Sequence, residues 1–325
     1  MKRTLLALAL TLVGAFAAVA QQSNPLPSWS DGPSKRAIIS FVEAVTKPGS
    51  TDFVPPAERI ATFDNDGCLW VEQPIYTQAF FIVDRMKALA PSRPEWKSNT
   101  LFSAVIEKGL AGLSGVSEHD LAELVAATHG GMTPADFRAL VSDWLATARH
   151  PRFNRPFTEL VYQPMLEILD YLRANGFKTY IVSGGGVEFV RAYAERVYGI
   201  PPEQVIGSRA KVAFETKDGR ATLTRQGSIE FIDDKAGKAI AIEHIIGRRP
   251  LAAFGNSDGD LEMLQWTTQA GGRRLGMIVH HTDDVREYAY DRESSVGRLA
   301  RALDQAPKEG WTIVDMKSEW NVVFK

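Results

Sequence analysis

The sequence predicts an α/β fold in which helices cover both faces of a parallel β-sheet, with an all-helical insertion. Short apolar runs alternate with helical segments from residue 158 onward, which is typical of a parallel sheet. Between residues 76 and 157 helical spacing recurs and no strand pattern is present. The composition, 45% hydrophobic and 23% charged over 325 residues, is that of a globular protein rather than a fibrous or disordered one.

Charge and cysteine content exclude several classes of protein. The chain has a single cysteine, so it has neither an internal disulfide framework nor a cysteine-based zinc cluster. Its 37 Lys and Arg residues are balanced by 39 Asp and Glu residues, a net charge of −2. This balance provides no basic surface for nucleic acid, so nucleic acid is not an expected partner.

The first twenty residues have the pattern of a secretory signal peptide. Lys2 and Arg3 precede an apolar run from residue 5 to residue 20, which ends in the small-x-small sequence Ala18-Val19-Ala20. We expect residues 1–20 to be removed, which leaves 35 basic and 39 acidic residues, a net charge of −4. No later segment is apolar enough to span a bilayer. The mature protein is therefore expected to be secreted or periplasmic, without membrane contact.

The remaining sequence divides into a linker, a core and a cap. Residues 21–34 are rich in Ser, Pro and Gln and indicate a linker. The core is expected at 35–75 and 158–325, beginning with a helix from Lys35 to Lys47 and a buried strand at 59–63. The cap is expected at 76–157, with helix starts at Ser117 and Thr133. The other predicted elements are helices at 164–175, 187–198 and 238–246, strands at 178–182, 204–207, 251–254 and 275–279, and a hairpin at 212–223.

Three predicted strands end in residues that carry chemistry. These residues are Asp64 and Asp66, Ser183 followed by three glycines, and Asn256, Asp258 and Asp260. Ligands bind beyond the carboxyl ends of the strands in an open parallel sheet, so the fold gathers these residues at one edge. This convergence is a stronger signal than any one of the three motifs.

The first of these strand ends predicts a nucleophile and an acid. Two carboxylates one residue apart are costly to desolvate, and a divalent cation such as Mg²⁺, which prefers oxygen ligands, relieves that cost. Asp64 is placed to attack phosphorus and form an aspartyl phosphate, and Asp66 to protonate the leaving oxygen and later activate water. A calcium-binding EF-hand loop is excluded because Thr62 and Gln73 occupy its first and twelfth positions.

The second strand end predicts a phosphate seat. The backbone N–H groups of Gly184 and Gly185, together with the hydroxyl of Ser183, are suited to bind phosphate oxygens. A dinucleotide fingerprint is excluded because its last glycine is missing. The bound phosphate needs a cation, for which Lys238 is the first candidate and Lys235 the second.

The motifs between Arg59 and Leu264, in their order along the chain, resemble those of the haloacid dehalogenase superfamily, and within it the phosphoserine-phosphatase-like group. The resemblance is carried by Phe63-Asp64-Asn65-Asp66-Gly67, Val182-Ser183-Gly184-Gly185, Lys238 and the segment Phe254 to Leu264. It implies a Rossmann-like core with an inserted helical cap. It also implies Mg²⁺-dependent hydrolysis of a phosphate monoester, with Asp64 as the nucleophile, Asp66 as the acid and base, and the Asp66 backbone carbonyl on the metal.

The resemblance also implies the metal residues Asp64, Asp66, Asn256 and Asp260. The metal motif of this superfamily usually begins with Gly-Asp, whereas this chain has Gly255-Asn256, which offers an oxygen without a charge. Asn256 and Asp258 both remain candidates to complete the metal site. Cys68 is interpreted as a small buried residue.

Other functions stay open at this stage. A non-catalytic secreted binding protein is favoured by Asn256 alone, whereas a phosphonate hydrolase needs a Schiff-base lysine such as Lys87, Lys97 or Lys108. Dehalogenation is disfavoured because dehalogenases of the family lack the acid that Asp66 provides.

The expected partner is a small-molecule phosphate ester, and phosphoserine-like, phosphocholine-like and broad-range substrates all stay open. Trp70, Glu72 and Gln73 are candidates for the site entrance, whereas His280 and His281 are expected to be structural. The sequence carries no signal for an oligomeric state. Six basic residues are candidates to meet an anionic substrate group: Arg85, Lys87, Arg138, Arg149, Arg152 and Arg155.

Overall fold

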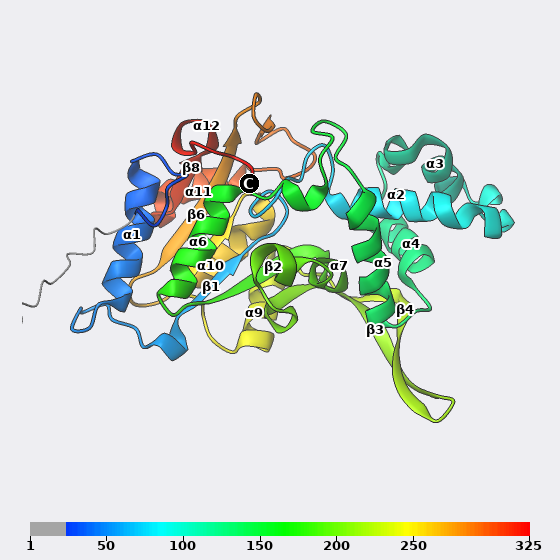
Figure 1. Ribbon diagram of the computed structural model, residues 1–325, viewed down its shortest axis with the longest axis horizontal. Coiled ribbons are helices and arrows are strands. Elements are labelled where there is room, and N and C mark those ends of the chain that lie inside the picture. The colour runs from blue at the N-terminus through cyan, green and yellow to red at the C-terminus, as the bar shows by residue number, and fades with distance from the viewer. Residues whose placement is uncertain (1–23) are drawn as a thin grey trace, which may run out of the picture.

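The computed structural model describes residues 24–325, so the expected signal peptide at 1–20 and residues 21–23 lie outside the described residues. The described chain forms one eight-stranded sheet with the order β4-β3-β2-β1-β5-β6-β7, and β8 pairs with β6 (Figure 1). The strands are β1 (Ile60–Phe63), β2 (Lys178–Gly186), β3 (Val205–Lys217), β4 (Arg220–Phe231), β5 (Ala252–Gly255), β6 (Leu275–Thr282), β7 (Ala289–Tyr290) and β8 (Thr312–Asp315).

The sheet is parallel at its centre and antiparallel at its edges. β1 pairs in parallel with β2 and β5, and further parallel pairs join β2 to β3, β5 to β6 and β6 to β8. β3 with β4 and β6 with β7 are antiparallel. β2, β1 and β5 are therefore neighbours, and their carboxyl ends meet at one edge of the sheet. This confirms the predicted α/β class with a parallel sheet core.

Some α-helices of the described chain cover the faces of this sheet, and others form a separate group beside it. Their bounds are α1 (Pro33–Thr46), α2 (Thr77–Leu89), α3 (Thr100–Lys108), α4 (Glu118–His129), α5 (Pro134–Thr147), α6 (Gln163–Ala174), α7 (Val187–Arg191), α8 (Ala194–Tyr198), α9 (Ala236–Ile246), α10 (Leu261–Thr268), α11 (Arg301–Glu309) and α12 (Met316–Glu319).

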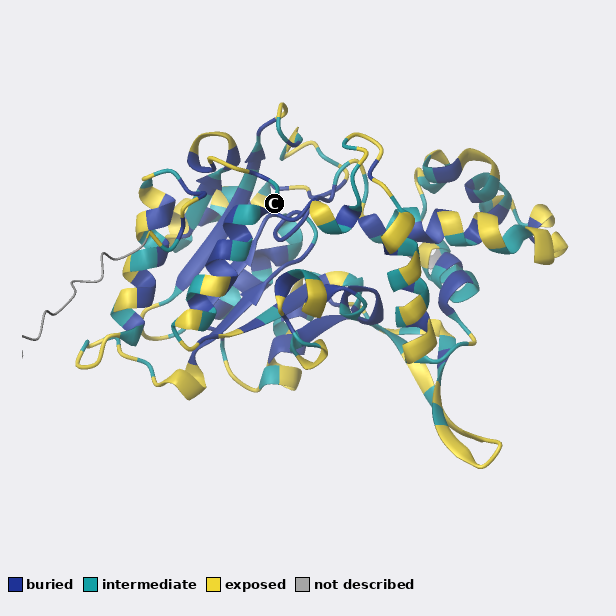
Figure 2. Ribbon diagram, in the orientation of Figure 1, coloured by how far each residue is buried: buried dark blue, intermediate teal, exposed yellow. Residues whose placement is uncertain are grey.

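Each face of the sheet has its own hydrophobic cluster. Successive side chains of a strand point to opposite faces. Accordingly, Ile181 belongs to the cluster that holds buried residues of α1 and α6, and Val182 to the cluster that holds those of α9, α10 and α11. All four residues of β1 are buried (Figure 2). The rings of Phe63 and Phe254 stack at 4.3 Å between β1 and β5. The central strands are thus rigidly held where the site begins.

Helices α2 to α5 lie together to one side of the sheet (Figure 1). A third hydrophobic cluster joins Ile82 and Met86 of α2 to Val105 of α3 and Leu124 of α4. The predicted helix starts are present, because the side chain of Ser117 accepts from the N–H of Asp120 and that of Thr133 from the N–H of Asp136.

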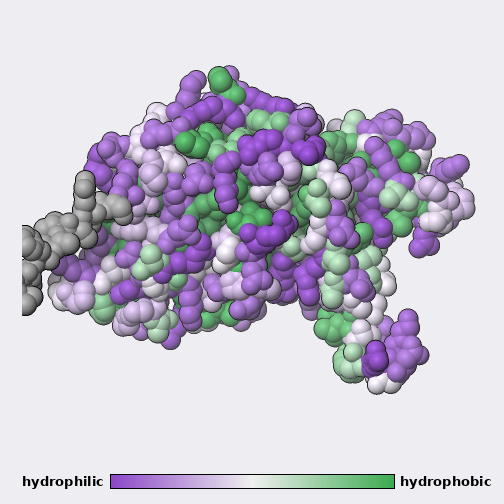
Figure 3. Space-filling model, viewed as in Figure 1, coloured by the Kyte–Doolittle hydropathy of each residue, from purple (hydrophilic) through white to green (hydrophobic). Residues whose placement is uncertain are grey.

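The β3–β4 hairpin is much longer than expected and projects away from the sheet (Figure 1). It turns at Asp218 and Gly219, whose φ angles of 50° and 74° suit the predicted two-residue turn. Its tip is exposed and hydrophilic (Figures 2 and 3). Nearer the sheet it pairs with the end of the cap, because Arg225 exchanges backbone hydrogen bonds of 2.9 Å with Gly131 and Met132. The hairpin assigned to the core thus also packs against the helical segment.

Two sequence predictions differ from the structure. The segment expected as a linker at 21–34 is packed in its described part, since Leu26 and Trp29 are buried and α1 begins at Pro33. The indole of Trp29 contacts that of Trp320 edge-on at 5.8 Å, which apolar burial stabilises. The helix expected at 187–198 is divided into α7 and α8. No helix within residues 24–325 combines the length and hydropathy needed to cross a lipid bilayer.

Candidate active site

Asp64 lies at the carboxyl end of β1 and contacts Lys238. The backbone N–H of Asp64 donates to the carbonyl of Phe254 at 2.9 Å, which continues the β1–β5 ladder to this residue. The ammonium of Lys238 lies 2.6 Å from Asp64 Oδ1 and 2.6 Å from Asp260 Oδ1. Lys235 instead points outward, with a 63% exposed side chain that is 3.8 Å from Asp234. The structure therefore places Lys238, and not Lys235, beside the predicted nucleophile.

The charges of Asp64, Asp260 and Lys238 act strongly on one another. Burial acts to lower the pKa of Lys238, but the charges of Asp260 and Asp64 outweigh it, so the pKa is raised and the ammonium stays charged. Burial and the charge of Asp260 raise the pKa of Asp64 well above its ordinary value, against the opposing effect of Lys238. A single ammonium thus has to neutralise two carboxylates, and a further cation would relieve the excess negative charge.

Asp66 faces the same cavity as Asp64. Its Oδ1 accepts a hydrogen bond of 2.9 Å from the indole N–H of Trp70, whose ring stacks on Tyr193 at 4.5 Å. Burial raises the pKa of Asp66, and the hydrogen bond from Trp70 opposes this shift. Trp70, a candidate for the site entrance, is fully buried and orients the predicted acid instead.

The three polar residues that follow β5, namely Asn256, Asp258 and Asp260, make different contacts. Asp258 Oδ1 accepts from the backbone N–H groups of Ala300 and Ala302 at 3.0 and 2.9 Å, so it holds the start of α11 rather than the site. Asp260 accepts from Lys238 with Oδ1 and from the N–H groups of Asn256 and Ser257 with Oδ2. Asp260 therefore fixes both the lysine and the loop that carries Asn256.

The side chain of Asn256 carries an oxygen that no hydrogen bond within the described chain occupies. Its Nδ2 donates to Glu72 Oε1 at 2.7 Å, and its buried Oδ1 has no hydrogen-bond partner in the described chain. Glu72 also accepts from the hydroxyl of Tyr290 at 2.8 Å, and burial raises its pKa well above its ordinary value. Glu72 thus holds the amide of Asn256 with nitrogen toward the carboxylate and oxygen away from it.

These oxygens fit a hard divalent cation. Within residues 24–325 no group of three or more His, Cys, Asp and Glu side chains is arranged to hold a metal ion. The expected set of Asp64, Asp66, Asn256 and Asp260 differs from such a group because Asp66 contributes its backbone carbonyl and Asn256 an amide oxygen. The buried Oδ1 of Asn256, which has no hydrogen-bond partner in the described chain, is an oxygen ligand that Mg²⁺ would satisfy. The carboxyl group of Glu72 orients this neutral ligand from behind.

The predicted phosphate seat lies at the carboxyl end of β2. Ser183 is buried, and its Oγ accepts from the N–H of Gly185 at 3.0 Å. A Cβ added to Gly185 would lie 3.2 Å from Ser183 Oγ and 3.8 Å from Asp66 Oδ2, so the absent side chain leaves space between these groups. Gly184 also lines the cavity. The N–H of the next glycine, Gly186, is occupied by Gln78 Oε1 at 2.9 Å.

A buried network supports the nucleophile loop from the C-terminal part of the chain. His281 Nε2 contacts the carbonyl oxygen of Gly67 at 2.7 Å, and its Nδ1 lies 3.1 Å from Glu287. Gly67 has a φ of +76°, and a Cβ there would lie 2.1 Å from Asn256 Nδ2. The expected structural role of His281 agrees with this position. Glu287 was not a candidate, since no motif connects it to this loop.

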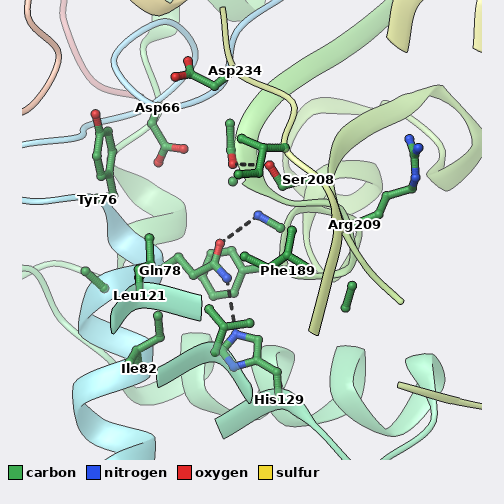
Figure 4. Close-up of a pocket in the computed structure, with 18 of the residues that line it drawn as sticks. Asp66, Tyr76, Gln78, Ile82, Leu121, His129, Phe189, Ser208, Arg209 and Asp234 are labelled. Carbon is green, nitrogen blue, oxygen red and sulfur yellow. Dashed lines mark hydrogen bonds between the residues drawn. The ribbon is translucent and has the colours of Figure 1, made fainter. Parts of the chain in front are cut away.

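A cavity of about 390 Å³ joins these groups to the cap and to the hairpin. Asp66 and Asp234 lie at one end of the view in Figure 4, and His129 and Ile82 at the other. Gln78 lies between the two ends and connects the N–H of Gly186 to Nε2 of His129, which is 3.3 Å from Gln78 Nε2 (Figure 4). Gln78 and His129 were not candidates, since neither belongs to a motif.

None of the six basic candidates of the cap lines this cavity. For example, Arg152 donates to the carbonyl of Asp284 and stacks on Tyr288, and Arg155 binds Glu159. The arginines that line the cavity are Arg209 and Arg225, which come from the hairpin. No sequence signal distinguished them, because the hairpin itself gave no reason to expect contact with the cap.

Comparisons with known proteins show what this fold and these motifs are similar to. Residues 61–265 match the family model of haloacid dehalogenase-like hydrolases. A search of curated proteins found no match. Among solved structures, a conserved functionally unknown protein from Anaerococcus prevotii DSM 20548 is 14% identical, with a TM-score of 0.57 over 87% of this chain and 91% of that chain.

Two further structures extend this comparison. A protein with unknown function from Bordetella pertussis Tohama I is 14% identical, with a TM-score of 0.50 over 80% of this chain and 99% of that chain. A phosphoserine phosphohydrolase-like protein from Francisella tularensis subsp. tularensis SCHU S4 is 17% identical, with a TM-score of 0.38 over 77% of this chain and 98% of that chain. At such identities the two higher TM-scores are evidence for the fold alone.

Proposed function

Because the chain belongs to the haloacid dehalogenase-like hydrolase family, we propose that it is a Mg²⁺-dependent phosphate monoester hydrolase that acts through an aspartyl phosphate. The observation that carries the proposal is the contact of Lys238 Nζ with Asp64 Oδ1 at 2.6 Å, in a cavity that Asp66 and Gly185 also line. A carboxylate, an acid and a phosphate seat thus face one space.

The first half of the reaction transfers the phosphoryl group to the protein. A carboxylate oxygen of Asp64 forms a bond to phosphorus while the bond from phosphorus to the leaving oxygen breaks. Asp66, with its raised pKa, carries the proton that the leaving oxygen takes. Lys238, the hydroxyl of Ser183 and the backbone N–H of Gly184 hold the phosphoryl oxygens, whose charge a bound Mg²⁺ would help to neutralise.

The second half releases phosphate and restores the site. Asp66, now a carboxylate, takes a proton from water as the water oxygen bonds to phosphorus. The bond between Asp64 and phosphorus breaks, so inorganic phosphate leaves and Asp66 again carries a proton. The hydrogen bond from Trp70 keeps Asp66 facing the cavity in both halves.

The residues that would hold Mg²⁺ are Asp64, Asp66 through its backbone carbonyl, and Asn256 through Oδ1. The unpartnered Oδ1 of Asn256 supports this assignment, as does Glu72, which orients the amide. Asp260, predicted as a metal ligand, has both oxygens engaged by Lys238 and by backbone N–H groups, so we assign it a positioning role.

A phosphonate hydrolase receives less support from the cavity. None of Lys87, Lys97 and Lys108 is among the described residues that line the cavity. The lysine that does line it, Lys238, is held by Asp64 and Asp260 and stays protonated, so it is not a free amine for a Schiff base.

The proposed function is tested by hydrolysis of 4-nitrophenyl phosphate with Mg²⁺ and with excess EDTA. We expect turnover with Mg²⁺ and loss of turnover in EDTA and in Asp64→Asn, with thermal unfolding used to show that the variant is folded. Full activity in EDTA or in Asp64→Asn would contradict the mechanism. Binding of phosphate esters without turnover of any of them would favour a non-catalytic binding protein.

We also propose that the protein is exported. The basic start, the apolar run and the Ala18-Val19-Ala20 site of the sequence support this proposal. Expression of the full chain with a C-terminal tag, followed by cell fractionation and N-terminal sequencing, tests it. A product that keeps Met1 and stays in the cytosolic fraction would contradict export.

A further inference from the structure

Arg225 of β4 is a buried cation in the wall of the active-site cavity. Its residue exposure is 6%, although arginine is usually exposed. Its Nε donates to the backbone carbonyl of His129 at 3.2 Å, and its guanidinium lies 4.4 Å from the centre of the Phe137 ring. These contacts fix the side chain at the cap end of the cavity and leave its Nη groups without a hydrogen-bond partner in the described chain.

The charge of Arg225 is not neutralised within the described residues. No carboxylate lies within 4.0 Å of its guanidinium, whereas the other cavity arginine, Arg209, lies 3.6 Å from Glu230. Glu188, the acid whose charge acts on Arg225, is already bound by Arg138 and Arg191. A buried cation without an ion-pair partner is costly, unless a ligand supplies the anion.

Among the described residues that line the cavity, none at the cap end carries a negative charge that would bind this cation. Oγ1 of Thr128 donates to the carbonyl of Leu124, so it accepts from Nδ1 of His129, and Nε2 of His129 accepts from Gln78. Burial lowers the pKa of His129 to about 3, so its ring is neutral. The acids of the cavity, Asp66 and Asp234 among them, lie at the opposite end (Figure 4).

Apart from Gln78, much of the cavity wall toward the cap end is apolar. Side chains from α2, α4, α7 and β4 form it, namely Ile82, Leu121, Val125, Phe189 and Ile229. A ligand that reaches from Asp64 to Arg225 therefore meets a phosphate seat, an apolar stretch and then a cation.

We propose that the substrate is a phosphate monoester whose alcohol part has an apolar body and carries a second oxyanion, which Arg225 binds. The guanidinium suits a carboxylate or a second phosphoryl group, because either offers two oxygens to its N–H donors. This inference rests on the proposed function. It disfavours phosphocholine-like substrates, since a quaternary ammonium would approach the unpaired cation of Arg225.

The test compares matched esters on the wild-type enzyme. The first pair is 4-carboxyphenyl phosphate and its neutral counterpart 4-carbamoylphenyl phosphate, and a third ester carries a 4-phosphono group. The same acid and amide comparison is made on alkyl phosphates with three and five methylenes, so that the distance to Arg225 does not limit the result. We expect kcat/KM for the anionic member of at least one pair to exceed that of its amide at least tenfold.

The variants assign this preference to Arg225. Arg225→Met should remove the preference, so that kcat/KM for the two members of each pair differs by less than about threefold, and Arg225→Lys should keep part of the preference. The matched control, Arg209→Met, should keep the full preference, because Glu230 already neutralises Arg209. Thermal unfolding of each variant shows whether it is folded.

The outcomes are separable. If the amide esters are hydrolysed as fast as the anionic ones in every pair, the inference about Arg225 is wrong while the phosphatase function stands. This comparison needs only the wild-type enzyme, so a variant that does not fold leaves it intact. If no ester is hydrolysed, the proposed function fails. A preference for the phosphono ester over the carboxy ester assigns a second phosphoryl group, and the reverse assigns a carboxylate.

Discussion

Asp233 provides a prediction about stability that the structure makes quantitative. This residue follows β4 and is 0% exposed, and neither oxygen of its carboxylate has a hydrogen-bond partner in the described chain. Burial raises its pKa from 3.8 to about 7, against the attraction of Lys238 and Arg209. The folded chain therefore holds a proton that the unfolded chain releases at much lower pH.

The sign and size of the effect follow from linkage. Stability is highest below the unfolded pKa of 3.8, falls as the pH rises toward the folded pKa of about 7, and levels off above it. Between about pH 5 and about pH 8, these two pKa values make wild-type stability fall by about 2.5 kcal/mol through Asp233 alone. Asp233→Asn cannot titrate, so this part of the pH dependence disappears in the variant.

The measurement is urea unfolding of wild type and Asp233→Asn at several pH values across this range. Any pH-independent cost of the new amide cancels when the variant's stability relative to wild type is compared between the two ends of the range. The matched control is Asp234→Asn, whose side chain in the wild type is 41% exposed and which should follow the wild-type curve. Parallel curves for wild type and Asp233→Asn would show that Asp233 is not a buried, protonated carboxyl group.

Three further predictions concern the proposed active site. Asp64→Asn should lower kcat for 4-nitrophenyl phosphate by roughly 10³-fold or more without changing the unfolding temperature by more than a few degrees. Retained turnover would exclude Asp64 as the nucleophile. Glu72→Gln should weaken Mg²⁺ binding by about 10- to 100-fold in a calorimetric titration, because it replaces the carboxyl group that orients the Asn256 amide, whereas Tyr290→Phe keeps that carboxyl group and should cost less. Equal losses in both variants would argue against a specific role for the Glu72 carboxyl group. Gly67→Ala should lower the free energy of unfolding by on the order of 3 kcal/mol, because the new Cβ would lie 2.1 Å from Asn256 Nδ2 at a φ of +76°. An unchanged denaturation midpoint would contradict this geometry.

The sequence alone identified the residues at the strand ends. Asp64, Ser183 and Asn256 each follow a short apolar strand, and the carboxyl ends of neighbouring parallel strands lie at one edge of a sheet. The structure places β2, β1 and β5 side by side, so the predicted convergence follows from local pattern and one general rule of topology. Lys238 was predicted with Lys235 as its alternative, because their spacing alone does not decide which ammonium turns inward.

The sequence could not assign residues whose role depends on contacts between distant segments. Asp258 and Asp260 are two positions apart, yet one holds α11 and the other holds Lys238. The cap arginines had a plausible position in the chain, but the unpaired arginine of the cavity comes from β4, about 160 residues beyond Asp64.

What the sequence determined by itself was the sheet, the helical segment and the identity of the groups that face the expected phosphate, because backbone periodicity and strand ends are local properties of the chain. The tertiary structure alone decided which charges are buried and which are paired. Burial and pairing depend on side chains from several elements that meet in space, as Glu72 and Asn256 do, or Arg225 and Phe137.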